Sequence, residues 1–147
     1  MISMSDKPDL EFLDTNILVY AHDQSAGEKH ATARNLVRRL WETENGCISV
    51  QVLQEFYVTV TRKVAQPMSM EDAAQIVRDI SFWRIHAPNA EDGLGAIDIQ
   101  RHYQVSFWDA MIIQSAKCSG CTVIWSEDLS EGQSYENLHV RNPFRQA

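Results

Sequence analysis

The sequence has few cysteines and no long apolar run. Its three cysteines, an odd number, do not complete the disulfide framework of a small secreted domain. No apolar stretch approaches the roughly 20 residues that cross a bilayer, and the polar residues 1–10 show no signal-peptide pattern. We therefore expect a cytoplasmic protein without a membrane segment.

Positive charge is also scarce. Thirteen lysines and arginines face twenty aspartates and glutamates, which gives a formal net charge of −7. This balance argues against a nucleic-acid partner, because phosphate binding favours a basic surface. The objection weakens if several acids share a metal site, since a bound cation reverses the local charge.

The chain has enough apolar sequence to form a folded core. Its 147 residues are 44% apolar and contain no repeat, low-complexity segment or linker. This predicts a single domain over residues 1–147, in which residues 1–10 form a loose leader.

Short apolar runs alternate with segments of helical periodicity. Apolar residues recur at helical spacing over residues 28–45, where Gly46 would end the helix, and over residues 50–64. This alternation predicts a three-layer α/β/α sandwich with a mostly parallel central sheet, in which ligands bind beyond the carboxyl ends of the strands. The expected strands are a short run before Asp14, then residues 47–49, 82–86, 122–125 and 139–140.

Acidic residues recur at or near the expected strand ends. Asp14 ends the first strand, Glu55 lies in the helix after the second, Asp109 opens the helix before the fourth, and Asp128 follows the fourth. Four clustered carboxylates would repel one another, and a divalent cation would remove that repulsion. Oxygen ligands alone suit Mg²⁺ or Mn²⁺ better than Zn²⁺.

Each acid also has a purely local interpretation. Asp14 would cap the following helix, Asp109 would form a capping box with Ser106, Asp128 would belong to a turn, and Glu55 would face solvent. The arrival of four acids at one sheet edge favours the metal site.

The acids stand within motifs that resemble those of PIN-domain ribonucleases, and most closely those of VapC-type toxins from bacterial toxin–antitoxin pairs. The resemblance extends over about Phe12 to Phe144. The motifs, in chain order, are Leu13-Asp14-Thr15-Asn16, Gln54-Glu55-Phe56-Tyr57, Ser106-Phe107-Trp108-Asp109-Ala110 and Ser126-Glu127-Asp128.

The resemblance implies Mg²⁺/Mn²⁺-assisted hydrolysis of RNA phosphodiester bonds, with Asp14, Glu55, Asp109 and Asp128 as metal ligands and catalytic residues. It also implies a cognate antitoxin and a homodimer. Three further residues would support the acids: Thr15, Asn16 and Ser126. The family usually has threonine where Ser126 stands, and the adjacent Glu127 leaves the identity of the fourth ligand open.

Three other interpretations remain open. An aspartyl-nucleophile phosphatase would need an aspartate at position 16, where Asn16 stands, and a lysine near the later acids. A phosphorylation-receiver module would need paired acids after the first strand and a lysine after the last. A catalytically inactive PIN-like binding module would keep the fold without the reaction.

Other polar and aromatic residues carry weaker signals. Cys118 and Cys121 form a C-x-x-C at a helix end, whereas a redox motif places its reactive cysteine at a helix N-terminus, so a structural role is favoured. The five histidines show no metal-ligand spacing. Arg39 is a candidate phosphate contact or an ordinary solvated charge, and Trp108 is either a core or interface residue or a platform for a base.

Overall fold

A six-stranded sheet, mostly parallel, lies at the centre of the protein. The computed structural model describes residues 9–145, so residues 1–8 of the predicted leader lie outside the described chain. The strands follow the spatial order β3-β2-β1-β4-β6-β5, and neighbours are parallel except for the β5–β6 pair. Their bounds are β1 Glu11–Leu13, β2 Gly46–Ser49, β3 Arg84–His86, β4 Val123–Trp125, β5 Ser134–Tyr135 and β6 Leu138–Arg141.

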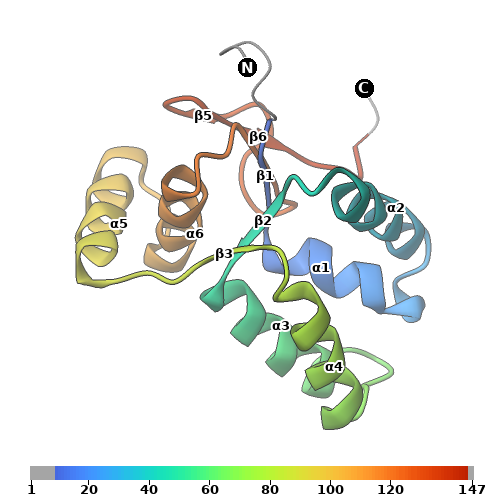
Figure 1. Cartoon of the computed structure of the whole chain (residues 1–147). Helices are drawn as coiled ribbons and strands as arrows, with labels where there is room; N and C mark the ends of the chain where they lie inside the picture. Colours follow the sequence, from blue (N-terminus) through green and yellow to red (C-terminus); the bar gives the residue numbers. More distant parts are fainter. Residues whose placement is uncertain (1–8, 146–147) are drawn as a thin grey trace, which may run out of the picture.

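Helices cover both sides of this sheet. The α5–α6 pair lies on one side, and helices α1 to α4 lie on the other (Figure 1). This arrangement confirms the predicted α/β sandwich with a mostly parallel sheet. Within residues 9–145, no helix is both long and apolar enough to cross a membrane. The helix bounds are α1 Thr15–His22, α2 Glu28–Thr43, α3 Val50–Arg62, α4 Met70–Ile80, α5 Ala90–Tyr103 and α6 Phe107–Cys118.

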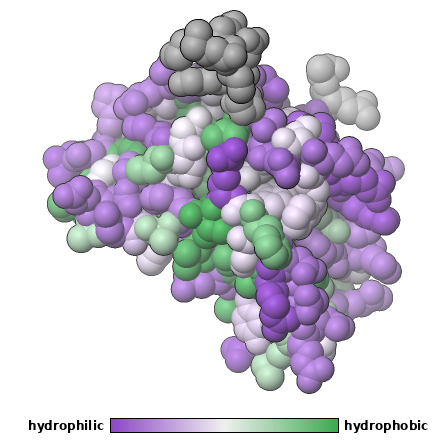
Figure 2. Space-filling view, viewed as in Figure 1, coloured by the Kyte–Doolittle hydropathy of each residue, from purple (hydrophilic) through white to green (hydrophobic). Residues whose placement is uncertain are grey.

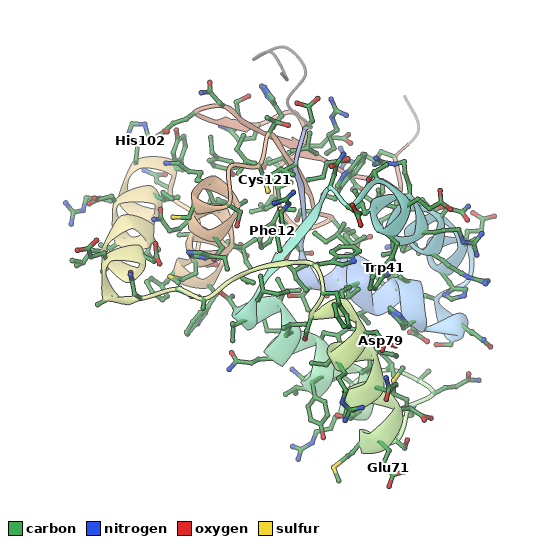
Figure 3. All side chains as sticks on the ribbon, in the orientation of Figure 1. Phe12, Trp41, Glu71, Asp79, His102 and Cys121 are labelled. Atoms are coloured by element: carbon green, nitrogen blue, oxygen red, sulfur yellow. The ribbon has the colours of Figure 1, made fainter. Side chains whose placement is uncertain are left out.

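The core forms because the central strands are buried on both faces. Every residue of β1 and β2 is buried, as expected where helices pack on both sides of a parallel sheet. Phe12 on β1 is completely buried and lies at the centre of the molecule (Figure 3). The helices pack apolar residues against this core, and most of the face shown in Figure 2 is hydrophilic.

Capping side chains fix where several helices begin. Ser49 accepts a hydrogen bond from the amide of Val52 at the start of α3, and Asn89 with Asp92 forms a capping box at the start of α5. These starts agree with the sequence pattern. The predicted end of α2 differs: the helix stops at Thr43, two residues before the predicted end at residue 45.

Gly46 has another role than ending a helix. It is the first residue of β2, and a Cβ at this position would lie 2.5 Å from the indole ring of Trp83. The missing side chain therefore makes room for Trp83. Strand β5 was not predicted, because two residues are too short to show an alternating pattern.

Candidate active site

The strand order reverses beside β1, the position at which open α/β sheets form a ligand-binding crevice. The chain passes from β1 to β2 on one side, whereas β4 pairs with β1 on the other. In open α/β sheets, ligands bind at such a reversal, outside the carboxyl ends of the strands. Asp14 directly follows β1 and its amide donates to the carbonyl of Trp125 at the end of β4 (3.0 Å). Two segments more than 100 residues apart therefore meet here.

Asp14 is a buried carboxylate with an exposed fraction of 8%. One oxygen accepts the amide of Thr15 (2.8 Å), which caps α1, and the other accepts the hydroxyl of Ser126 (2.8 Å). Burial raises the pKa of Asp14 to about 6, with further contributions from the charges of Asp128 and Asp109. The local capping interpretation is therefore correct, and it coexists with clustering of acids.

Ser126 connects the end of β4 to Asp14. Its side chain is completely buried, and its oxygen also accepts the amides of Asp128 (3.2 Å) and Leu129 (3.1 Å). Asp128 itself is exposed, and one of its oxygens accepts a hydrogen bond from the amide group of Asn16 (2.8 Å). Burial, followed by the charges of Glu127 and Asp109, raises the pKa of Asp128.

Asp109 approaches the same crevice from the first turn of α6. Its amide donates to the capping hydroxyl of Ser106 (3.1 Å). The charge of Asp109 contributes to the raised pKa of both Asp14 and Asp128, so these three carboxylates lie close enough to interact. The structure thus brings three of the four predicted acids together.

Glu55 lies at the border of this group. It is exposed on α3, and it accepts a hydrogen bond from Gln51 (2.8 Å), whose amide also donates to the carbonyl of Trp108 (3.4 Å). This links Glu55 to the segment before Asp109. Glu55 is not among the charges that raise the pKa of Asp14. Its role as a metal ligand stays a prediction, as do those of the three aspartates.

Glu127 binds side chains of α1 and α2. It pairs with Lys29 and accepts the hydroxyl of Tyr20 (2.8 Å). Although burial opposes it, the hydrogen bonds from Lys29 and Tyr20 lower the pKa of Glu127. Lys29 and Tyr20 were not predicted, because no local motif connects either residue to a loop about 100 positions later.

The clustered aspartates fit a divalent cation. Across residues 9–145, none of the ion pairs involves Asp14, Asp109 or Asp128. The buried hydroxyl oxygen of Thr15 has no hydrogen-bond partner among the described residues. Carboxylate and hydroxyl oxygens without a cationic partner are the donor set that Mg²⁺ or Mn²⁺ prefers.

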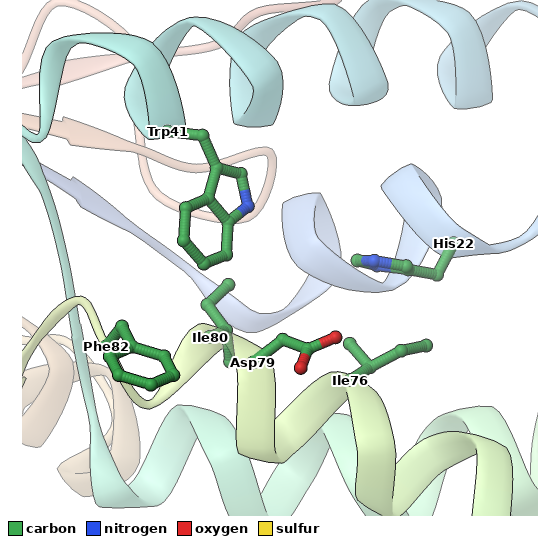
Figure 4. Close-up of a pocket in the computed structure, with 6 residues that line it drawn as sticks. All are labelled: His22, Trp41, Ile76, Asp79, Ile80 and Phe82. Atoms are coloured by element: carbon green, nitrogen blue, oxygen red, sulfur yellow. The ribbon is translucent and has the colours of Figure 1, made fainter.

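A separate hollow of about 460 Å³ lies between α1, α2 and α4. In Figure 4 the indole of Trp41 faces Ile80, and His22 enters from α1. None of the predicted acids lines this hollow. The candidate active site therefore lies at the carboxyl edge of the sheet and not in the cavity between these helices. The hollow is lined by His22, Trp41, Ile76, Asp79, Ile80 and Phe82.

Several solved structures share this fold. The toxin VapC20 of Mycobacterium tuberculosis, described as cleaving the sarcin–ricin loop, matches with a TM-score of 0.60 and 21% identity over 80% of this chain and 89% of that chain. A toxin–antitoxin complex from Klebsiella pneumoniae matches with a TM-score of 0.68 and 15% identity, over 92% of this chain and 99% of that chain. DNA-bound VapBC from Salmonella typhimurium matches with a TM-score of 0.64 and 20% identity, over 92% of this chain and 99% of that chain.

Comparisons of sequence give the family. A search of curated proteins found no significant match. The family model of the PIN domain matches residues 12–130, a span that contains Asp14, Glu55, Asp109 and Asp128. Because this match covers most of the chain, it confirms the resemblance predicted from the motifs. The protein belongs to the PIN domain family.

Proposed function

We propose that this protein is a Mg²⁺- or Mn²⁺-dependent endoribonuclease and the toxin of a type II toxin–antitoxin module. The observation that carries the proposal is the meeting of Asp14, Asp109 and Asp128 at the crevice of a PIN fold. VapC20, which shares the fold and is described as cleaving the sarcin–ricin loop, supports RNA as the substrate.

In this proposal Asp14, Asp109 and Asp128 hold the cation, and Glu55 completes the site from α3. A bound Mg²⁺ or Mn²⁺ would lower the pKa of the attacking water and offset negative charge on the phosphoryl group. Ser126 positions Asp14 through its hydroxyl. Asn16 holds Asp128, and Thr15 steadies Asp14 through its amide. Catalysis then derives mainly from positioning and electrostatics.

Trp108 is the best candidate for contact with an RNA base. It is 65% exposed and directly precedes Asp109, so the core interpretation of this residue is wrong. An exposed indole offers a stacking surface that accepts any base. Arg39 is not free for phosphate, because its guanidinium binds both oxygens of Glu11 (2.8 Å each). Because the protein carries a net charge of −7, its affinity for RNA would depend on the shape of the RNA and on a few specific contacts.

The proposed partners are a cognate antitoxin and a second copy of the chain, acting in the cytoplasm with RNA. Structural neighbours include a toxin–antitoxin complex and a DNA-bound VapBC. The apolar surface between α3 and α4, which includes Leu53, Tyr57 and Val77, offers area for a helix-mediated homodimer. The hollow beside Trp41 and Ile80 offers a place for apolar side chains of an antitoxin.

One feature of the structure agrees with the phosphatase interpretation, and two contacts argue against it. The structure places Lys29 near the later acids, but its ammonium pairs with Glu127. Asn16, where a phosphatase needs its second aspartate, donates to Asp128 and cannot act as an acid. A test with a phosphomonoester beside the RNA separates the two activities.

The decisive assay measures cleavage of structured RNA by the purified protein with Mn²⁺, with Mg²⁺ and with EDTA. Asp14→Asn should reduce cleavage at least 100-fold, since one carboxylate of the cation site is lost. Asp98→Asn, an exposed change on α5, is the matched control and should cleave normally. Cleavage in EDTA, or full activity of Asp14→Asn, would contradict the proposed mechanism. Absence of cleavage in the wild type with both metals would favour a binding module.

A further inference from the structure

A second group of metal-ligating side chains lies where β3 ends against α5 and α6. One ligand atom from each of His86, Asp92 and Cys118 lies within 4.8 Å of the other two. The Nε2 of His86 is 3.3 Å from one oxygen of Asp92, and the sulfur of Cys118 is 3.3 Å from the other oxygen. A nitrogen, an oxygen and a sulfur ligand therefore face one another across three separate elements.

The surrounding residues would support a bound metal. The remaining ring nitrogen of His86 lies 2.8 Å from the buried hydroxyl of Ser115, and metal-bound histidines normally use that nitrogen for a hydrogen bond. The amide of Gln114 donates to the sulfur of Cys118 (3.4 Å) and to Asp92 (3.3 Å). The same amide therefore contacts both Cys118 and Asp92, two of the three candidate ligands.

Gly95 makes room for this amide. A Cβ at residue 95 would lie within 2.8 Å of all three polar-end atoms of Gln114. Glycine is a poorer helix former than alanine, so a glycine within α5 needs a packing explanation. The close approach of Gln114 to α5, which directs the amide toward Cys118, supplies that reason.

We propose that His86, Asp92 and Cys118 form a site for Zn²⁺ or a similar borderline divalent ion. A mixed nitrogen, oxygen and sulfur set selects such ions over Mg²⁺. Cys118 is exposed, so an ion can enter and a water can take the fourth position. Binding releases the thiol proton to solvent and leaves a thiolate on the metal. The ion would join the end of β3 to the α5–α6 pair.

This site is separate from the acidic crevice. Asp109 stands in the first turn of α6 and Cys118 is its last residue. At about 1.5 Å per residue, the two positions are roughly 13 Å apart along the helix. The alternative is a hydrogen-bonded network without metal, in which Cys118 donates to Asp92 while Asp92 accepts the amide of Asn89 (2.9 Å).

Cobalt absorption distinguishes these alternatives. The full chain carrying Asp14→Asn and Asp109→Asn, which weakens binding at the crevice, is titrated with Co²⁺. We expect a near-ultraviolet thiolate-to-cobalt band that Zn²⁺ displaces. Cys118→Ser should abolish this band and His86→Ala should weaken Co²⁺ binding at least 10-fold. His102→Ala, an exposed histidine elsewhere on α5, should leave the band unchanged.

Zinc titration calorimetry gives a second readout that does not depend on the thiolate band. Gln114→Ala should weaken Zn²⁺ binding about 10- to 100-fold, the effect typical of residues that orient metal ligands. The exposed Gln100→Ala is the control and should bind normally. A parent protein without the cobalt band, or a band that persists in Cys118→Ser, would overturn the proposal and leave the hydrogen-bonded network.

Discussion

Asp14 is a buried carboxylate whose surroundings compensate its charge only in part. Hydrogen bonds from Thr15 and Ser126 favour the charged form, while burial and the nearby Asp128 and Asp109 disfavour it. The net effect is the raised pKa, which costs stability whenever Asp14 is ionised without a cation. A cation at the crevice would reverse that cost, so the same residue links stability to metal binding.

The first prediction concerns pH in the metal-free protein. Because burial raises the pKa of Asp14 from 3.8 to about 6, the folded state holds its proton longer than the unfolded state. The contribution of Asp14 to stability is complete below pH 3.8 and is lost as pH rises through about 6. The loss is on the order of 3 kcal/mol.

This loss is measured by urea unfolding in EDTA across this pH range, with Asp14→Asn as the comparison. The difference in unfolding free energy between the two proteins should shift against the wild type as pH rises. Other acids, such as Glu11 with its lowered pKa, titrate in both proteins and cancel. A difference that stays constant from pH 4 to pH 7 would show that Asp14 is not perturbed.

The second prediction concerns the hydroxyl of Ser126. Ser126→Ala leaves the amides of Asp128 and Leu129 without their acceptor and Asp14 without a donor. We expect a loss of about 1–3 kcal/mol in unfolding free energy and a reduced RNA cleavage rate. Ser126→Thr keeps the hydroxyl and should retain more of both. Equal activity of the alanine and threonine variants would remove Ser126 from the proposed mechanism.

At the scale of elements, short contacts at strand ends decide how helices and strands meet. The bidentate pair of Glu11 and Arg39 joins β1 to α2, and the indole of Trp125 also donates to Glu11 (2.8 Å). Trp83, which follows α4, packs against Trp41 of α2 with ring centroids 5.6 Å apart. These contacts connect segments that the sequence separates widely.

The third prediction tests the contact between β2 and Trp83. Gly46→Ala places a Cβ 2.5 Å from the Trp83 ring, so the indole must shift from its contact with Trp41 or the strand must move. Overpacking of this kind typically costs about 1–3 kcal/mol, measured here by denaturant unfolding. Gly93→Ala, at a helical position with open space around its Cβ, is the control and should be neutral or stabilising. A neutral Gly46→Ala would mean that Trp83 can adjust at no cost.

Local sequence explains where these helices begin, but it does not explain the pairing of β5 at the edge of the sheet. Ser49, Ser69 and Ser106 each cap the helix that follows by accepting the amide three residues later. The pairing of Ser134 and Tyr135 with β6 depends on the long-range position of β6 beside β4. No periodicity in two residues reports such a position, so the sequence pattern did not predict β5.

At the scale of the whole molecule, the sheet order brings three of the four predicted acids together. The exchange of neighbours around β1 places Asp14 and Asp128 at one edge, and α6 carries Asp109 to it. If the protein acts on RNA as proposed, a cation bound at this edge would offset the repulsion expected from the net charge of −7. Metal binding, stability and activity should therefore change together.

The fourth prediction measures this coupling. Mg²⁺ at 100 times its dissociation constant should stabilise the folded protein by about 2.7 kcal/mol, which raises the melting temperature by several degrees. Asp109→Asn should lose most of that increase, and Asp98→Asn should keep it. Mg²⁺ is chosen because it does not favour the sulfur and nitrogen ligands proposed around Cys118. An equal increase in both variants would place the Mg²⁺ site elsewhere.

The sequence by itself predicted the fold class, helices over residues 28–45 and 50–64, and Asp14, Glu55, Asp109 and Asp128 as candidate site residues, of which the structure places the three aspartates near one another. These follow from local physics: hydrophobic periodicity, capping residues and acids that end parallel strands. Only the tertiary structure decided that Glu127 turns toward Lys29 and that Arg39 binds Glu11.

The group of His86, Asp92 and Cys118 also comes only from the tertiary structure. The histidines show no metal-ligand spacing along the chain, because their proposed partners come from other elements. Which side chains meet there depends on how α5 and α6 pack beside β3. That packing results from contacts between distant segments, which residue spacing along one chain does not encode.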